Sequence, residues 1–128
     1  MILLDTCALL WYAQDRTRLS PRARAALAAP EVVTHVSAIT AWEITLKHTV
    51  GRLHLPLDPW EWYQEAVSSL GLVELPLDAR VAHRAAALPL LHRDPADRFL
   101  TATALVHGMK LLTPEPLIHP YEGLDAVW

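Results

Sequence analysis

The chain has 128 residues, of which 52% are hydrophobic and 20% are charged, and 11 basic against 14 acidic residues give a formal net charge of −3. This composition supports one folded domain over residues 1–128 and excludes a disordered chain. The single cysteine, Cys7, excludes an internal disulfide and a cysteine-based zinc site. No run approaches the roughly 18 apolar residues of a membrane span, so we expect a soluble, cytoplasmic protein with no membrane segment.

Four short apolar runs predict strands, at residues 2–4, 32–35, 72–75 and 110–113. The segments between them have helical length and periodicity, which predicts an α/β fold around a mostly parallel sheet of four to five strands. Three helices are expected to begin where a capping side chain precedes a proline: Ser20-Pro21, Asp58-Pro59 and Asp94-Pro95. Gly108 is expected to end the last long helix.

Two acidic residues follow predicted strands. Asp5 closes the first strand, and Glu115 follows the strand that ends at Thr113. Ligands of open α/β sheets collect at the carboxyl ends of strands, so both are candidate site residues. The alternatives are a helix cap for Asp5, on a helix that begins near Thr6, and an ordinary loop acid for Glu115.

Glu43 falls within an apolar helical stripe. In the helix that Ser37 opens, the stripe is formed by Ile39, Trp42, Leu46 and Val50. Glu43 lies about 40° from Ile39 around the helix axis, so its carboxylate is directed at apolar neighbours and requires a compensating partner. The alternative is an exposed pair with Lys47, four residues later.

Asp94 and Asp97 lie about 60° apart on the helix that begins at Pro95, with Thr101 between them on the same face. Asp94 repeats the capping pattern of the other helix starts. Asp97 suits the first helical turn, where an acid interacts favourably with the helix dipole. The helix after it is apolar nearly all round, so we expect this helix to be buried and Asp97 to face a partner.

Carboxylates gathered from separate elements repel one another unless a cation joins them. Mg²⁺ and Mn²⁺ prefer oxygen ligands, and such ions support attack of water on phosphodiesters. Seven scattered histidines offer metal-free acid–base chemistry as an alternative, but only His92, beside Asp94, is a candidate. Among the tryptophans, Trp60 and Trp62 are the expected contacts for a partner.

The order and spacing of these segments resemble the PIN-domain family, specifically its VapC-type toxins. The resemblance is carried by the segments 1–11, 36–44, 92–105 and 111–113. It implies a three-layer α/β/α fold and a cytoplasmic endoribonuclease toxin of a type II toxin–antitoxin system. Such an enzyme depends on Mg²⁺ or Mn²⁺ and cuts single-stranded or loop RNA. Its catalytic, metal-binding acids would be Asp5, Glu43 and Asp97.

The resemblance also implies roles for further residues. Asp94 would cap its helix, join the catalytic acids at the metal, or do both, and Glu115 stands where the family usually has an aspartate as a fourth ligand. Supporting roles fall to Thr6, Thr113 and His92, and phosphate contacts to Arg93 and Arg98. The implied partners are the RNA substrate, a second copy in a homodimer and a VapB-type antitoxin that covers the cleft.

The sequence also allows two alternative functions. The first is a catalytically impaired PIN-fold module that binds RNA or protein, because the final motif, Thr113-Pro114-Glu115, departs from the family pattern. The second is a nuclease that cuts structured DNA. Cys7 is a further departure, since it stands where related chains often carry histidine.

Overall fold

A five-stranded parallel sheet runs through the middle of the protein, whose computed structural model describes residues 1–128. The strand order is β3-β2-β1-β4-β5, and every neighbouring pair is parallel. The strands are β1 (Ile2–Leu4), β2 (Thr34–Ser37), β3 (Val73–Leu75), β4 (Lys110–Leu112) and β5 (Asp125–Val127). The predicted α/β fold with a parallel sheet is therefore confirmed.

The second and fifth strands differ from the sequence-based expectation. β2 begins at Thr34, because the N–H of Val32 is turned back to the carbonyl of Ala29 and is not available to a neighbouring strand. β5 was not located in advance, because it has only three residues and begins with an exposed aspartate. Its pairing with β4 is continued by the Thr113 N–H, which donates to the carbonyl of Val127.

Helices connect the strands and begin where the capping patterns predict. They are α1 (Thr6–Gln14), a 3-10 turn (Arg16–Arg18), α2 (Pro21–Ala28), α3 (Ala38–Thr49), α4 (Pro59–Ser69), α5 (Ala79–Ala87) and α6 (Pro95–His107). Each α-helix has an N-cap side chain that accepts a backbone N–H, supplied in order by Asp5, Ser20, Ser37, Asp58, Asp78 and Asp94. Gly108 ends α6 with φ of 64°, a left-handed conformation that glycine adopts without strain.

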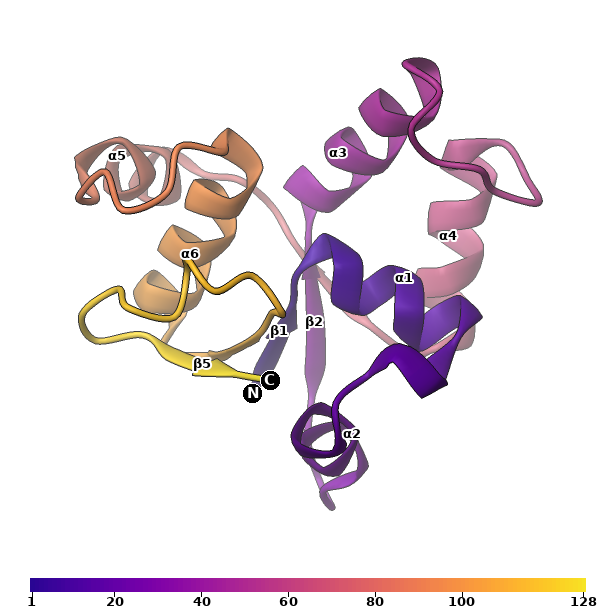
Figure 1. The fold of residues 1–128 in the computed structure, drawn as a ribbon, viewed down its shortest axis with the longest axis horizontal. Coiled ribbons are helices and arrows are strands. Elements are labelled where there is room, and N and C mark those ends of the chain that lie inside the picture. The colour runs from indigo at the N-terminus through magenta and orange to yellow at the C-terminus, as the bar shows by residue number, and fades with distance from the viewer.

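The helices cover both faces of the sheet. In Figure 1, α1, α3 and α4 lie to the right of the sheet, and α5 and α6 lie to its left. Successive side chains on a strand point to opposite faces, so Ile2 and Leu4 of β1 join the core under α1 and α4 while Leu3 packs with α6. β4 repeats this division with Leu112 and Leu111. The three-layer α/β/α architecture is thus confirmed.

The apolar stripe predicted for α3 is largely wrong. Trp42, Leu46 and Val50 are 51%, 44% and 58% exposed. The buried face of α3 instead carries Ile39, Thr40, Glu43 and Ile44. The helix has apolar residues on both faces, so periodicity alone did not identify the face that meets the sheet.

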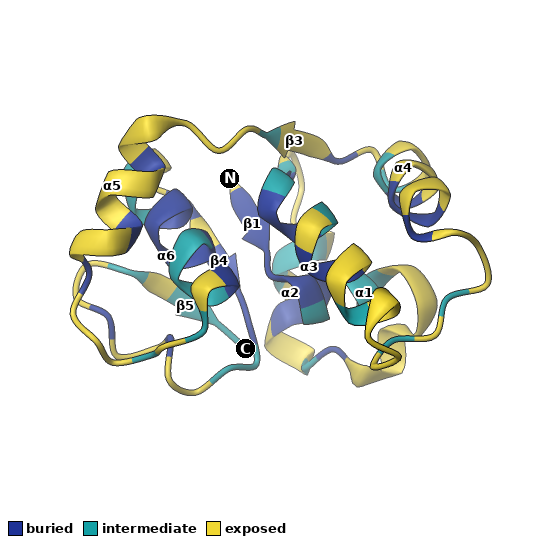
Figure 2. Ribbon diagram, turned by 90° about the horizontal axis from the view of Figure 1, so that it is seen from above, coloured by how far each residue is buried: buried dark blue, intermediate teal, exposed yellow.

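The two tryptophans of α4 also divide. Trp60 is 57% exposed as expected, whereas Trp62 is buried in the core. Figure 2 shows that α4 has an inner buried face and an outer exposed one. No helix is both long enough and apolar enough to cross a membrane.

Candidate metal centre

The acidic residues singled out in the sequence meet at the carboxyl end of the sheet. A pocket of about 210 Å³ lies there, lined by Asp5, Thr6, Cys7, Glu43, Lys47, Asp94, Asp97, Pro114 and Glu115. The lining comes from the end of β1, from α1 and α3, from the start of α6 and from the loop after β4. The parallel strands carry these segments to one edge, as the α/β architecture predicts.

Asp5 both caps a helix and lines the pocket. Its Oδ1 accepts the N–H of Ala8 at 2.7 Å, and its side chain hydrogen-bonds with Thr113. Burial, together with the smaller effect of the nearby Asp97 and Glu43 charges, nevertheless raises the pKa of Asp5 to about 7. Asp5 is therefore both the cap of α1 and a residue of the candidate site.

Glu43 is buried with its two oxygens in different surroundings. Oε2 lies 3.1 Å from the Nζ of Lys47, whereas Oε1 is buried and has no hydrogen-bond partner. The intrahelical pair with Lys47 thus exists, but it is not the exposed pair of the alternative reading, because only 7% of the Glu43 side chain is exposed. An unpartnered buried carboxylate oxygen is costly, and a cation in the pocket would satisfy it.

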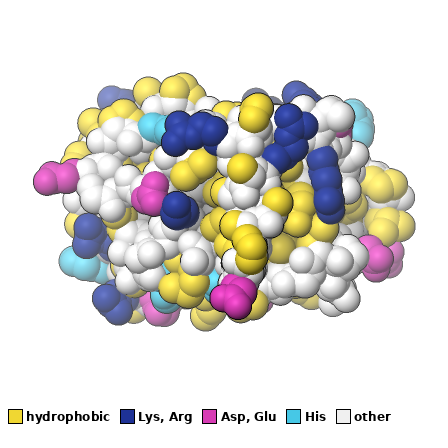
Figure 3. Space-filling model, turned by 90° about the horizontal axis from the view of Figure 1, so that it is seen from below, with side chains coloured by type: hydrophobic (Ala, Val, Ile, Leu, Met, Phe, Trp, Pro, Cys, Tyr) yellow, Lys and Arg dark blue, Asp and Glu magenta, His cyan; other side chains and the backbone are white.

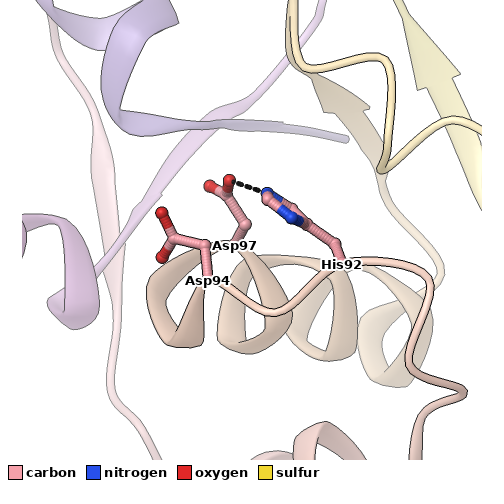
Figure 4. A group of neighbouring side chains, drawn as sticks. All are labelled: His92, Asp94 and Asp97. Carbon is pink, nitrogen blue, oxygen red and sulfur yellow. Dashed lines mark hydrogen bonds and ion pairs between the residues drawn. The ribbon is translucent and has the colours of Figure 1, made fainter.

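Asp97 is held by His92 (Figure 4), whose Nε2 lies 2.7 Å from Asp97 Oδ2. The backbone N–H of Arg93 donates to His92 Nδ1, which leaves the ring proton on Nε2 to be donated to Asp97. Burial raises the pKa of Asp97 to about 6, the Asp94 charge acts in the same direction, and the hydrogen bond from His92 opposes them. The structure therefore fits the supporting role expected of His92.

Asp94 and Glu115 complete the acidic lining while serving local structure. Asp94 Oδ1 caps α6 by accepting the N–H of Ala96, and a carboxylate oxygen of Asp94 lies within 4.8 Å of donor atoms of both His92 and Asp97. Glu115 Oε1 accepts the N–H of Leu117 at 3.1 Å. Each of these carboxylates still faces the pocket.

The two threonines expected to support the site are buried beside the acids. The hydroxyl of Thr6 donates to Thr40 across to α3 at 3.3 Å. Thr113 hydrogen-bonds Asp5 and also accepts the N–H of Glu115, so it joins the end of β4 to both acids. These bonds fix the relative positions of the segments that form the pocket.

The expectation that Arg98 contacts phosphate does not fit the structure. Its guanidinium makes five hydrogen bonds within the protein, to the carbonyls of Ala85, Leu88, Pro89 and His92 and to the hydroxyl of Tyr121. Arg98 is adjacent in sequence to Asp97 but is committed to the end of α5 and the loop that follows. Arg93 is exposed, yet it lines a different cavity, between α5 and α6.

Three pocket residues were not predicted as functional: Lys47, Cys7 and Pro114. The sequence indicates Lys47 only as a possible ion-pair partner of Glu43. The same spacing of four residues places both side chains on one face of α3, and this face lines the pocket. Burial raises the pKa of the Cys7 thiol to about 11, so it stays protonated at neutral pH and is a poor metal ligand.

The donor set suits a hard divalent cation. Five carboxylates line the pocket together with hydroxyl-bearing Thr6, and Mg²⁺ or Mn²⁺ prefers such oxygen ligands. The unpartnered Oε1 of Glu43 and the raised pKa values of Asp5 and Asp97 show that the protein alone does not compensate this negative charge. The residues present therefore fit a bound metal ion.

Comparison with known proteins agrees with the fold and identifies the family of the chain. Residues 2–115 match the family model of the PIN domain. The chain is 31% identical to Ribonuclease VapC22 of Mycobacterium tuberculosis (strain ATCC 25618 / H37Rv) over an alignment of 135 positions. The alignment covers 99% of this chain and 98% of that protein.

Two solved structures have the same fold. One is VapBC2 from Rickettsia felis bound to a DNA fragment from its promoter, with a TM-score of 0.71 and 16% identity over 98% of this chain and 97% of that one. The other is a toxin–antitoxin complex from Klebsiella pneumoniae, with a TM-score of 0.64 and 21% identity over 97% and 95%. From the family match and the similarity to VapC22, the chain belongs to the PIN-domain family and to its VapC type.

Proposed function

We propose that this protein is a metal-dependent endoribonuclease toxin whose activity a cognate antitoxin inhibits. The observation that carries the proposal is the meeting of Asp5, Glu43 and Asp97 in one pocket, with Glu43 Oε1 buried and unpartnered. The similarity to a protein named as a ribonuclease supports RNA as the substrate.

Asp5, Glu43 and Asp97 would hold Mg²⁺ or Mn²⁺, with Asp94 and Glu115 close enough to contribute. When bound, such an ion activates water for attack on a phosphodiester and stabilises the leaving oxygen. The acids come from three different elements, so the correct fold is needed to assemble the site.

The rest of the pocket keeps these acids in place. The Ala8 N–H and the Thr113 hydroxyl fix Asp5, and the Nε2–H of His92 fixes Asp97. Groups that orient metal-binding carboxylates typically matter tenfold to a hundredfold for metal affinity or activity. Burial of the acids also lowers the local dielectric, which strengthens their attraction for a cation.

The antitoxin would bind exposed apolar side chains of α3 and α4. These are Trp42 and Leu46 of α3, Val50 at the C-cap of α3, and Trp60 of α4. Side chains of this kind at helical spacing suit an amphipathic partner segment. The similarity in fold to toxin–antitoxin complexes supports such a partner, and a homodimer stays a prediction from the family resemblance.

The test is cleavage of RNA by purified protein with and without Mn²⁺, alongside single-stranded and structured DNA. We expect RNA cleavage that EDTA abolishes and that is lost in Asp97→Asn. The matched control is Asp125→Asn, which removes an exposed carboxylate of β5 far from the pocket. Undiminished metal-dependent cleavage by Asp97→Asn would refute the assignment.

The alternatives predict other results. A binding module would retain RNA without cleaving it and would show no heat of Mn²⁺ binding at millimolar concentration. A DNA nuclease would cut structured DNA in the parallel digests.

A further inference from the structure

Lys47 is the only basic residue that lines the acidic pocket. The other charged lining residues are five carboxylates: Asp5, Glu43, Asp94, Asp97 and Glu115. RNA is a polyanion, so a pocket of this charge repels its phosphates even when a divalent ion offsets part of the charge. A cation that belongs to the protein is therefore valuable at this position.

Neither of the two arginines nearest the pocket acids in the sequence lines the pocket. Arg98 is fully used by hydrogen bonds to α5, to the following loop and to Tyr121, and Arg93 lines the separate cavity between α5 and α6. Figure 3 shows Lys and Arg side chains on the face seen from below, whereas the pocket lies at the carboxyl ends of the strands. Lys47 is the basic group in reach of a phosphate that enters the pocket.

The geometry of Lys47 suits two contacts at once. Its Nζ lies 3.1 Å from Glu43 Oε2. An ammonium group has three donors, so this contact leaves two of them unused. The Lys47 side chain is 38% exposed, against 7% for Glu43, which places the amine between the buried acid and solvent.

We propose that Lys47 takes part in RNA cleavage by holding Glu43 through Oε2, which leaves Oε1 for the metal, and by donating to a non-bridging oxygen of the scissile phosphate. This inference rests on the proposed nuclease function, because the second contact requires the RNA. The first contact is a property of the metal site and is testable without RNA.

The experiment compares Lys47→Met, Lys47→Arg and the control Lys110→Met. Lys110 also pairs with an acid, Asp125, at 3.8 Å, but this pair is exposed and lies on the opposite edge from α3. Thermal unfolding first establishes that all three variants fold. Mn²⁺ affinity is then measured by calorimetry without RNA, and kcat/KM for RNA is measured over a range of salt concentrations.

In Lys47→Met we expect Mn²⁺ to bind severalfold less tightly, because Glu43 is no longer held with Oε1 directed to the metal. We expect kcat/KM to fall at least tenfold. The slope of log kcat/KM against log salt should become shallower by about 0.7, the contribution of one phosphate contact to a single strand. Lys47→Arg should keep the wild-type slope and recover part of the rate, and Lys110→Met should match wild type throughout.

Two results would overturn the proposal. Wild-type cleavage by Lys47→Met would show that the amine has no part in the reaction. Weaker Mn²⁺ binding together with an unchanged salt slope would show that Lys47 only maintains the structure of the pocket.

Failure of the nuclease function itself would look different. The wild-type protein would then cleave no RNA, while weaker Mn²⁺ binding by Lys47→Met would still report the Glu43 contact.

Discussion

Asp97 and Arg98 are neighbours in α6, yet they belong to two opposite kinds of charged region. Arg98 has its charge satisfied within the protein by four backbone carbonyls and the Tyr121 hydroxyl. Asp97 faces a pocket where Asp5 has a raised pKa and Glu43 Oε1 has no partner. The Arg98 network is complete and serves stability, whereas the pocket is incomplete and requires a ligand.

Arg98→Met should cause the largest loss of stability. The substitution leaves the carbonyls of Ala85 and Leu88, at the end of α5, without their donor, and we expect the free energy of unfolding to fall by about 4 kcal/mol. Urea unfolding measures this change. Arg93→Met is the control, with a change within about 0.5 kcal/mol. Equal effects for the two variants would mean that the Arg98 network does not stabilise the fold.

Asp5→Asn should have the opposite effect and stabilise the metal-free protein at pH 8. Burial raises the pKa of Asp5 to about 7 in the folded state from the ordinary aspartate value of 3.8, so the unfolded chain releases its proton first as pH rises. The acid therefore costs stability progressively from about pH 4 to pH 7, by about 4 kcal/mol in full. Asparagine removes this cost and can still cap α1.

Denaturation in EDTA at pH 4 and pH 8 tests this prediction. The advantage of Asp5→Asn should be small at pH 4 and fully developed at pH 8. A variant less stable than wild type at pH 8 would mean that the protein itself already compensates the Asp5 charge.

Mn²⁺ should stabilise the wild-type protein but not the variant that lacks the Asp5 carboxylate. At a hundredfold excess over its dissociation constant, the ion adds about 2.7 kcal/mol to the free energy of unfolding. Thermal unfolding with and without Mn²⁺ measures the increment. Arg98→Met should lose part of the increment, because Arg98 also holds the carbonyl of His92, whose ring orients Asp97. An unchanged increment would show that the pocket is energetically independent of the Arg98 network.

Glu115→Gln should have the smallest effect. The glutamine Oε1 can still accept the N–H of Leu117, so stability should change by less than about 0.5 kcal/mol. We expect only a modest loss of Mn²⁺ affinity by calorimetry, because Glu115 supports the site from the loop after β4. A loss as large as that of Asp5→Asn would make Glu115 an equal metal ligand.

The sequence predicted the fold class, the helix starts and the segments that meet at the pocket, because each depends on local patterns. Capping residues before prolines have a local geometric cause, and strand ends of a parallel sheet meet at one edge. The surroundings of Arg98 were not predictable in this way. Its acceptors are far from it in the sequence. Pro89 lies nine residues and Ala85 thirteen residues before it, and Tyr121 lies 23 residues after it.

The misread stripe of α3 has a similar cause. Trp42 and Ile44 are both apolar, and only the packing of α3 against α1 and the sheet decides which of them is covered. Burial of Glu43 was predicted correctly, although the residues used to argue it are mostly exposed. A carboxylate near the boundary between two helix faces is consistent with either choice of buried face.

The hydrogen bonds of Arg98 also reach the carbonyl of His92, the residue whose ring holds Asp97. Arg98 thereby fixes the backbone at His92. The orientation of the Asp97 carboxylate is therefore set by the folded protein and not by the substrate. A mutation that releases this contact would weaken the fold and misalign the acid together. Loss of stability and loss of a correctly oriented Asp97 would therefore occur together, and proteolysis of the unstable protein would lower its abundance.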